Sequence, residues 1–117
     1  SSWWMFAFYI NLDRMACSSK EFAAALNSEG IPFSCGYIPM PIFEYPAIKN
    51  RITFGASSLP WTLPRARKDI QYDVKDYPGT AKALSDVIKM SWCEGITLDD
   101  AADIDQAIRK VAAFYRK

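Results

Sequence analysis

The sequence predicts one α+β domain spanning residues 1–117, with a small, mostly antiparallel sheet of three or four strands and helices packed mainly on one face. Three observations lead to this prediction. Short apolar runs bounded by turn residues are typical of strands, other segments repeat their apolar residues at helical spacing, and the proline-rich centre follows neither period. The length is also near the common size of a single globular domain.

The apolar run Trp3–Ile10 predicts the first strand. Its apolar residues occupy both alternating faces, so we interpret it as a buried strand with both faces covered. The run is far shorter than the ~20 residues of a membrane span and lacks the basic start of a signal peptide. A domain this small cannot hide all of its first aromatic residues, so we expect a large apolar patch or a dimer that covers it. The aromatic residues concerned are Trp3, Trp4, Phe6 and Phe8. No initiator Met precedes the strand, which suggests a piece of a longer chain.

A helix and a second strand are predicted to follow. Ser18 and Glu21 have the spacing of a capping box, in which the serine oxygen accepts from a backbone N–H and the glutamate reaches back to the start of the helix. The apolar face of this helix consists of Phe22, Ala23 and Leu26. Gly30 supplies a left-handed stop, and Ile31–Tyr37 is predicted to be a strand.

The segment 39–78 is predicted to be a long ordered loop with short turns. It contains six of the seven prolines, is rich in aromatic residues, and shows neither a helical nor a strand period. Loops of this length in compact domains are usually functional or cover another surface. The basic cluster Arg65–Lys68 is followed at once by acidic residues, which predicts a solvated charged turn.

Regular structure is predicted again after Pro78, which can open a helix. The apolar residues at helical spacing in this segment are Ala81, Leu84 and Ile88. A short strand is expected at Lys89–Trp92. The final helix has apolar residues spaced i, i+4, i+7 and i+11, namely Ile104, Ile108, Val111 and Tyr115. Acidic residues in its first turn and basic residues near its end match the helix dipole.

The composition argues against several classes of function. A net charge of +1 without a basic stripe argues against a dedicated nucleic-acid-binding protein. The chain has no histidine, so the usual base near neutral pH is missing and a zinc site would lack ligands. No glycine-rich loop for a phosphate or dinucleotide is present. Three cysteines at wide spacing, Cys17, Cys35 and Cys93, are expected to be free cytoplasmic thiols.

The individual candidate residues have simple structural interpretations. The four aspartates near the start of the last helix are expected to be dipole partners rather than metal ligands: Asp99, Asp100, Asp103 and Asp105. Cys35 lacks a histidine partner, and we interpret it as a buried small hydrophobe rather than a nucleophile. No lysine has a sequence context that marks a desolvated Schiff-base residue. No catalytic residue is therefore predicted, and the chain is not expected to catalyse a reaction alone.

The order of these motifs resembles the C-terminal small domain of the DegT/StrS-type aminotransferases, pyridoxal-phosphate enzymes that aminate keto-sugars and keto-cyclitols. The resemblance covers nearly the whole chain. Its centre is similar to the family loop Gly-Tyr-Pro-x-Pro-Leu-Tyr-x-x-Pro, in the version found in the branch that contains inosose aminotransferases. The matching segments are Phe6–Glu29, Gly30-Ile31-Pro32, Gly36-Tyr37, Pro39, Pro41, Pro46, Thr53–Gly55, Leu59–Trp61, Tyr77-Pro78 and Asp100–Val111.

The resemblance implies a fold like the small domain of fold-type I aminotransferases. It also implies a parent enzyme in which a lysine of a large domain, absent from this chain, holds pyridoxal phosphate as an imine. The chain itself would bind neither cofactor nor metal. It would pack against the large domain or a homodimer partner in the cytoplasm, and neither nucleic acid nor a membrane is expected as a partner.

Two residues are predicted to contact substrate, Tyr37 and Phe43. Tyr37 offers a hydroxyl and a ring edge suited to a polyhydroxylated ring, and the neighbouring prolines would lower the entropic cost of holding it. The alternative is that both rings only pack beneath the loop. The chain departs from the family pattern at Ile42-Phe43, where relatives carry Leu-Tyr, and at Ala81, where relatives commonly carry glutamate.

Two hypotheses about function remain open. In the first, the chain is the small domain of a sugar or cyclitol aminotransferase, inactive alone and competent only with its large domain. In the second, it is an autonomous binding or dimerisation module of the same ancestry, without catalysis.

Overall fold

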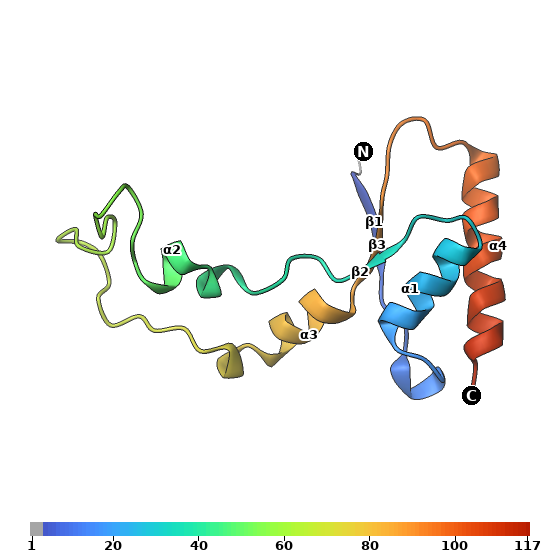
Figure 1. Ribbon diagram of the computed structural model, residues 1–117, viewed down its shortest axis with the longest axis horizontal. Coiled ribbons are helices and arrows are strands. Elements are labelled where there is room, and N and C mark those ends of the chain that lie inside the picture. The colour runs from blue at the N-terminus through green and yellow to red at the C-terminus, as the bar shows by residue number, and fades with distance from the viewer. Residues whose placement is uncertain (1–3) are drawn as a thin grey trace. The chain divides into compact units, whose positions relative to one another are not determined.

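The computed structural model describes residues 4–117, which divide into two compact units (Figure 1). The first unit, here called the body, comprises residues 4–37 and 85–117. The second unit, here called the insert, comprises residues 38–84 and connects the two halves of the body along the chain. The residue Trp3, predicted to begin the first strand, lies outside the described residues.

The body contains a three-stranded antiparallel sheet. Its strands are β1 (Met5–Phe8), β2 (Ser34–Cys35) and β3 (Ile88–Ser91), in the order β1-β3-β2. β3 therefore lies in the centre and pairs antiparallel with both neighbours. These pairings confirm the predicted α+β class with a small antiparallel sheet.

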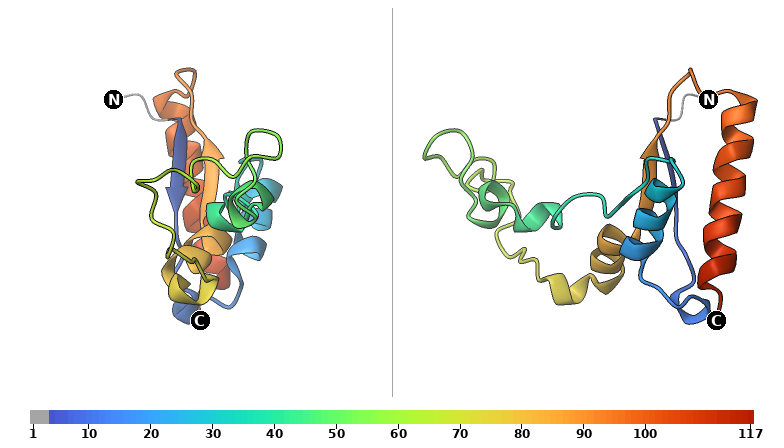
Figure 2. Two further views of the ribbon diagram at one scale, coloured as in Figure 1. Left: turned by 90° about the vertical axis from the view of Figure 1, so that its left-hand side faces the viewer. Right: turned by 45° about the vertical axis from the view of Figure 1, so that its right-hand side comes forward.

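Two helices cover one face of this sheet. α1 (Ser19–Ser28) and α4 (Leu98–Tyr115) pack against each other. Figure 1 shows both to the right of the strands, and α4 lies behind β1 and β3 in the left-hand view of Figure 2. The buried core of the body consists of Phe22, Ala23, Leu26, Phe33, Ile88, Met90, Ile104, Ala107 and Val111. Helices mainly on one face were predicted, and this arrangement is confirmed.

Capping boxes fix where the two helices begin. At α1, the Ser18 hydroxyl oxygen accepts from the Glu21 N–H at 3.2 Å, and the Glu21 carboxylate accepts from the Ser18 N–H at 2.8 Å. The sequence predicted this box. An equivalent box at α4 joins Thr97 and Asp100 and was not predicted. Each box satisfies backbone N–H groups that the first turn of a helix leaves without partners.

The first strand differs from its prediction, because β1 is an edge strand that only β3 borders. Phe6 and Phe8 lie opposite Met90 and Ile88 and therefore face the helices, whereas the alternate positions of β1 face away from them. Within the described residues β1 is not buried on both faces, so that prediction is wrong for this chain alone, whereas covering by a partner stays a prediction. Trp4 is 71% exposed and Phe6 is 38% exposed, so aromatic residues of this segment do remain unhidden, as the size argument predicted.

The second strand is shorter than the predicted Ile31–Tyr37. Pro32 has no N–H to donate, and the Phe33 N–H donates to the Ile31 carbonyl at 2.8 Å in a tight turn, so pairing begins only at Ser34. Gly36 then leaves the strand with φ +83°. The turn and the glycine together limit β2 to two residues.

Helix α3 (Pro78–Asp86) begins at the predicted proline but does not include Ile88. Ile88 opens β3, pairs with Cys35 of β2 and is fully buried. The prediction that Ile88 continues the helical stripe is therefore wrong. An apolar residue at position 88 fits the helical repeat, but the buried centre of the sheet requires an apolar residue there too.

Before α3, the insert contains only short regular elements, as predicted for residues 39–78. They are two 3₁₀ turns, Ile42–Glu44 and Val74–Asp76, and the four-residue α2 (Pro46–Lys49). Most of α3 also belongs to the insert. No residue in 38–84 is buried. The basic cluster Arg65–Lys68 lies in exposed turns, in agreement with the predicted solvated turn.

None of the helices formed by residues 4–117 combines the length and the apolar character that crossing a bilayer requires.

We predict that Leu26→Ala lowers the free energy of unfolding by about 2–5 kcal/mol, because Leu26 is fully buried in the core and its removal leaves a cavity. Phe114→Ala serves as a control, since Phe114 is 79% exposed, and its effect should stay below about 1 kcal/mol. Urea unfolding followed by circular dichroism measures both. Equal losses in the two variants would contradict the proposed core.

We also predict that the capping boxes make stability fall in acid. Hydrogen bonds from Ser18 lower the pKa of Glu21, and hydrogen bonds from Thr97 lower the pKa of Asp100. The unfolded chain therefore binds protons more readily. This stability is present above the unfolded pKa values and is lost as pH falls through the lower, folded ones.

Thermal midpoints measured from pH 6 to pH 3 test this, at about half-unit steps. Glu21→Gln and Asp100→Asn should each flatten the decline in the midpoint. Asp99→Asn is the control, because Asp99 lies in the same first turn but takes no part in the capping box, and Asp100→Asn should flatten the decline more than Asp99→Asn does. Identical profiles for Asp100→Asn and Asp99→Asn would show that the box does not contribute.

Candidate functional site

Tyr37 is the last residue of the first half of the body and lies two residues after the end of β2. Gly36 precedes it in a left-handed conformation with φ +83°, which only glycine adopts without strain. The Gly36 N–H donates to the Val87 carbonyl at 2.8 Å and ties this corner to the start of β3. Tyr37 is 48% exposed, so a ligand can reach this residue.

Phe43 lies in the insert, within the 3₁₀ turn after Pro41, and packs against two tyrosines. Its ring stacks on Tyr72 with centroids 5.4 Å apart and an interplanar angle of 19°, and it contacts Tyr77 at 5.2 Å. These contacts join the outgoing and returning segments of the insert. Phe43 thus has a packing role of the kind that the alternative interpretation predicted, and it belongs to a different unit from Tyr37.

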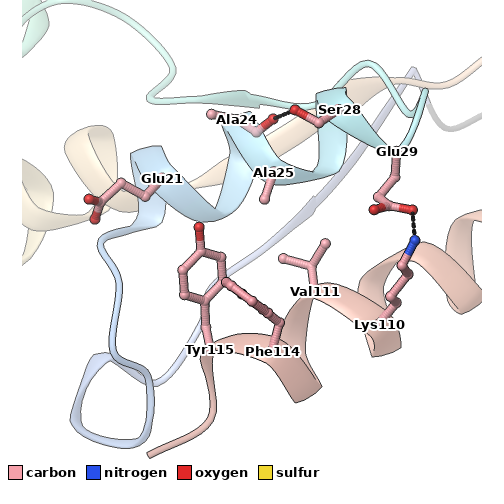
Figure 3. Close-up of a pocket in the computed structure, with 9 residues that line it drawn as sticks. All are labelled: Glu21, Ala24, Ala25, Ser28, Glu29, Lys110, Val111, Phe114 and Tyr115. Carbon is pink, nitrogen blue, oxygen red and sulfur yellow. Dashed lines mark hydrogen bonds and ion pairs between the residues drawn. The ribbon is translucent and has the colours of Figure 1, made fainter.

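A groove on the body lies between α1 and α4, with a volume of about 540 Å³ (Figure 3). Its walls are mainly apolar, and the lining residues are Glu21, Ala24, Ala25, Ser28, Glu29, Lys110, Val111, Phe114 and Tyr115. Phe114 and Tyr115 meet edge to face at 4.9 Å. The small side chains of Ala24 and Ala25 on α1 leave the space that the two aromatic rings of α4 border.

The charges of this groove are already engaged. Lys110 donates to the Glu29 carboxylate at 2.6 Å, which links the two helices. Glu21 is held in the capping box of α1, and those hydrogen bonds keep its pKa low, so it remains ionised and is unsuited to act as a base near neutral pH. The groove can hold an apolar or aromatic group, but its residues do not form an acid–base pair.

Sequence reasoning missed this groove because Phe114 falls outside the apolar stripe of the last helix. The signal was present: Phe114 lies three residues after Val111, at the edge of the buried face, and is followed by a second aromatic residue. A large apolar side chain beside the stripe, opposite the small alanines of the first helix, indicates a gap between two helices.

The three cysteines are free thiols in the structure. Cys35 was interpreted as buried, but it is only partly buried, and its thiol donates to the Ser85 carbonyl at 3.2 Å. Burial and the nearby Asp86 raise the pKa of Cys35, and burial and Glu21 raise the pKa of Cys17. Both shifts disfavour the thiolate that a nucleophile requires.

The aspartates near residue 100 serve the helix in different ways. Asp100 closes the capping box, and Asp105 accepts from Arg109 at 2.7 Å one turn later. Within residues 4–117, no group of three or more potential metal-binding side chains is found. The prediction that Asp100 is a helix-start partner agrees with these contacts.

Comparison with protein-family models, with curated proteins and with solved structures finds no match to this chain. The candidate features are therefore defined by this chain's own residues and are taken separately. The body has an exposed tyrosine that follows Gly36 and an apolar groove between α1 and α4, and the insert has an aromatic cluster around Phe43.

We predict that Gly36→Ala lowers the free energy of unfolding by about 1–2 kcal/mol, because an alanine at φ +83° is strained. Gly79→Ala is the matched control, since Gly79 lies in α3 and a Cβ there meets nothing within 4 Å. That change should be neutral or stabilise by up to about 1 kcal/mol. Chemical denaturation of both variants checks the difference, and the interpretation of Gly36 fails if Gly36→Ala is as stable as Gly79→Ala.

Proposed function

We propose that this chain is the small domain of a pyridoxal-phosphate-dependent keto-sugar or keto-cyclitol aminotransferase, and that it is inactive without a large domain. The observation that supports the proposal most is the ordered series of Gly36, Tyr37 and the prolines at 39, 41 and 46, which follows directly from a strand of a small antiparallel sheet. In this role the chain contributes a loop of the substrate cleft and a packing surface.

The residues of this chain do not fit the cofactor imine. A Schiff-base lysine needs a desolvated amine, which lowers its pKa. Seven of the eight lysines are exposed, and the remaining one, Lys89, is half-buried with its Nζ 3.1 Å from the Ser34 hydroxyl. On this proposal the cofactor lysine belongs to the large domain, and no step of the reaction is assigned to a lysine of this chain.

Tyr37 is the residue that we assign to the substrate. Tyr37 is half-exposed, and a tyrosine hydroxyl can donate to or accept from a hydroxyl of a sugar or cyclitol ring, while the edge of its own ring can pack on the apolar face of the sugar. Gly36 and the Val87 carbonyl fix the backbone from which Tyr37 projects. Phe43 supports the loop through Tyr72 and Tyr77, and its remaining exposure allows a second, apolar contact.

The second candidate function is an autonomous binding or dimerisation module. It is favoured by the amount of apolar surface that the chain exposes, such as Trp4 at 71% and Phe54 at 80%. Surfaces of this kind mark protein interaction sites. The DNA immediately upstream separates the two candidates: a large domain with a cofactor lysine, encoded in frame, supports the aminotransferase, whereas a start codon at this point supports the module.

We predict that, in the complete aminotransferase, Tyr37→Phe lowers kcat/KM for the keto substrate by about 3- to 10-fold, the value of one uncharged hydrogen bond. The half-reaction with the amino donor should change less. Tyr72→Phe is the matched control, because it loses a hydroxyl but keeps the ring that stacks on Phe43. Steady-state and half-reaction kinetics measure both, and equal effects of the two variants would remove Tyr37 from the substrate site.

A further inference from the structure

The groove between α1 and α4 has no part in the proposed function. Its volume of about 540 Å³ lies within the range of roughly 300–1,000 Å³ that small-molecule sites occupy, and all of its residues belong to the body. It contains neither Tyr37 nor Phe43, the two residues predicted to contact substrate. Binding at this groove can therefore be tested independently of the aminotransferase.

The walls of the groove suit a compact apolar group. Ala24 and Ala25 of α1 contribute only methyl groups, and Val111 of α4 is buried. Phe114 is 79% exposed although it lines an apolar groove, and its ring meets Tyr115 edge to face at 4.9 Å. An aromatic ring with so much free surface can still pack against a ligand.

An ion pair closes one end of the groove. Lys110 on α4 donates to the Glu29 carboxylate at 2.6 Å, and Figure 3 shows this pair crossing from one helix to the other. A compact ligand fits beside the pair, whereas a long peptide helix lying along the groove would have to break it. The pair also engages Lys110, the lining cation that an anionic ligand would need.

The other end of the groove carries a negative charge. Glu21 lines this end, and Figure 3 shows it beyond Tyr115, away from the ion pair. Ser18 donates to Glu21 through its N–H and its hydroxyl, and both hydrogen bonds go to Oε2. These bonds lower the pKa of Glu21, so the carboxylate is ionised near neutral pH. The capping box does not use the second carboxylate oxygen.

The end of α4 adds to this negative character. Phe114 and Tyr115 are the last two residues of α4, where the dipole of a helix is negative. The basic residues that follow, Arg116 and Lys117, do not line the groove. Lys117 instead donates to the Leu12 carbonyl at 3.3 Å. Two aromatic rings and a carboxylate thus lie together without a cation of their own among the lining residues at this end.

We propose that the α1–α4 groove binds a small organic cation, an amine or ammonium group carried on an aromatic or short alkyl body. The body packs on Ala25 and Val111, and the charge lies at the Glu21 end beside the rings of Phe114 and Tyr115. A cation gains there from an aromatic ring face and from a carboxylate at once. A neutral ligand of the same shape lacks both gains, and an anion is repelled.

Three probes of similar size and different charge test this on the whole chain. They are phenethylamine, which is a cation near neutral pH, its neutral counterpart phenethyl alcohol, and the anion hydrocinnamate. The amine should bind with a Kd of about 0.1–1 mM, at least about 5-fold more tightly than the alcohol. Hydrocinnamate should bind more weakly than either. Two-dimensional amide NMR measures the three affinities, and the shifts should centre on Ala25, Val111 and Phe114.

Variants separate the role of the carboxylate from that of the capping box. Glu21→Gln should bring the Kd of the amine to within about 2-fold of that of the alcohol, because the charge that prefers the amine is gone. Asp100→Asn is the matched control, since it alters the equivalent box of α4 outside the groove and should keep the preference. Ala24→Leu fills the groove from an exposed helical position and should weaken both ligands at least about 10-fold. Circular dichroism confirms that each variant is folded.

Four results would each overturn the proposal. They are an amine that does not bind below about 10 mM, an alcohol or hydrocinnamate that binds as tightly as the amine, a Glu21→Gln chain that prefers the amine as strongly as Asp100→Asn does, and amide shifts that lie outside the groove. Kinetics of Tyr37→Phe in the complete aminotransferase bear only on the proposed function, so the two proposals can fail separately.

Discussion

The body depends on the burial of β3 between its two neighbours and beneath two helices. Ile88 and Met90 project from this central strand into the space that Phe22 and Leu26 of α1 and Val111 of α4 fill. Since β1 and β2 pair only with β3 and not with each other, loss of the central strand would remove every ladder of the sheet. The buried residues accordingly lie on the face of the sheet that the helices cover. The opposite face and the edge strand β1 contain exposed residues.

This arrangement also fixes the base of the insert. The chain leaves β2 after Cys35 and returns to β3 at Ile88, and these two residues are register partners. The hydrogen bond from Gly36 to Val87 closes the same corner. Two of the three candidate features belong to this part of the chain. Tyr37 follows Gly36 where the chain leaves the sheet, and the Phe43 cluster connects the two segments of the insert. The core of the body thus holds the two ends of the insert, which contains no buried residue of its own.

The sequence predicted the elements better than their edges. Capping chemistry placed the start of α1, and the i, i+4 repeat placed the buried face of α4, because both signals act within one helix. Which strand lies in the centre of the sheet depends on pairings between residues far apart in sequence. The sequence alone therefore could not predict where β1 and β2 end or that Ile88 belongs to a strand. Tyr37 was singled out from its loop, and the structure shows only that it is exposed. The α1–α4 groove could not be predicted in this way, because it arises from side-chain volumes on two helices that meet only in the folded chain.

The register pair of Cys35 and Ile88 has a consequence for the evolution of this chain. Two residues 53 positions apart in sequence are held as direct neighbours, so the intervening segment behaves as a closed loop whose entropic penalty rises only with the logarithm of its length. Doubling the segment would cost about 0.6 kcal/mol in this approximation. Length variation between β2 and β3 is thus nearly free for the body, and this is the place where the chain can be lengthened, shortened or exchanged without disturbing the scaffold.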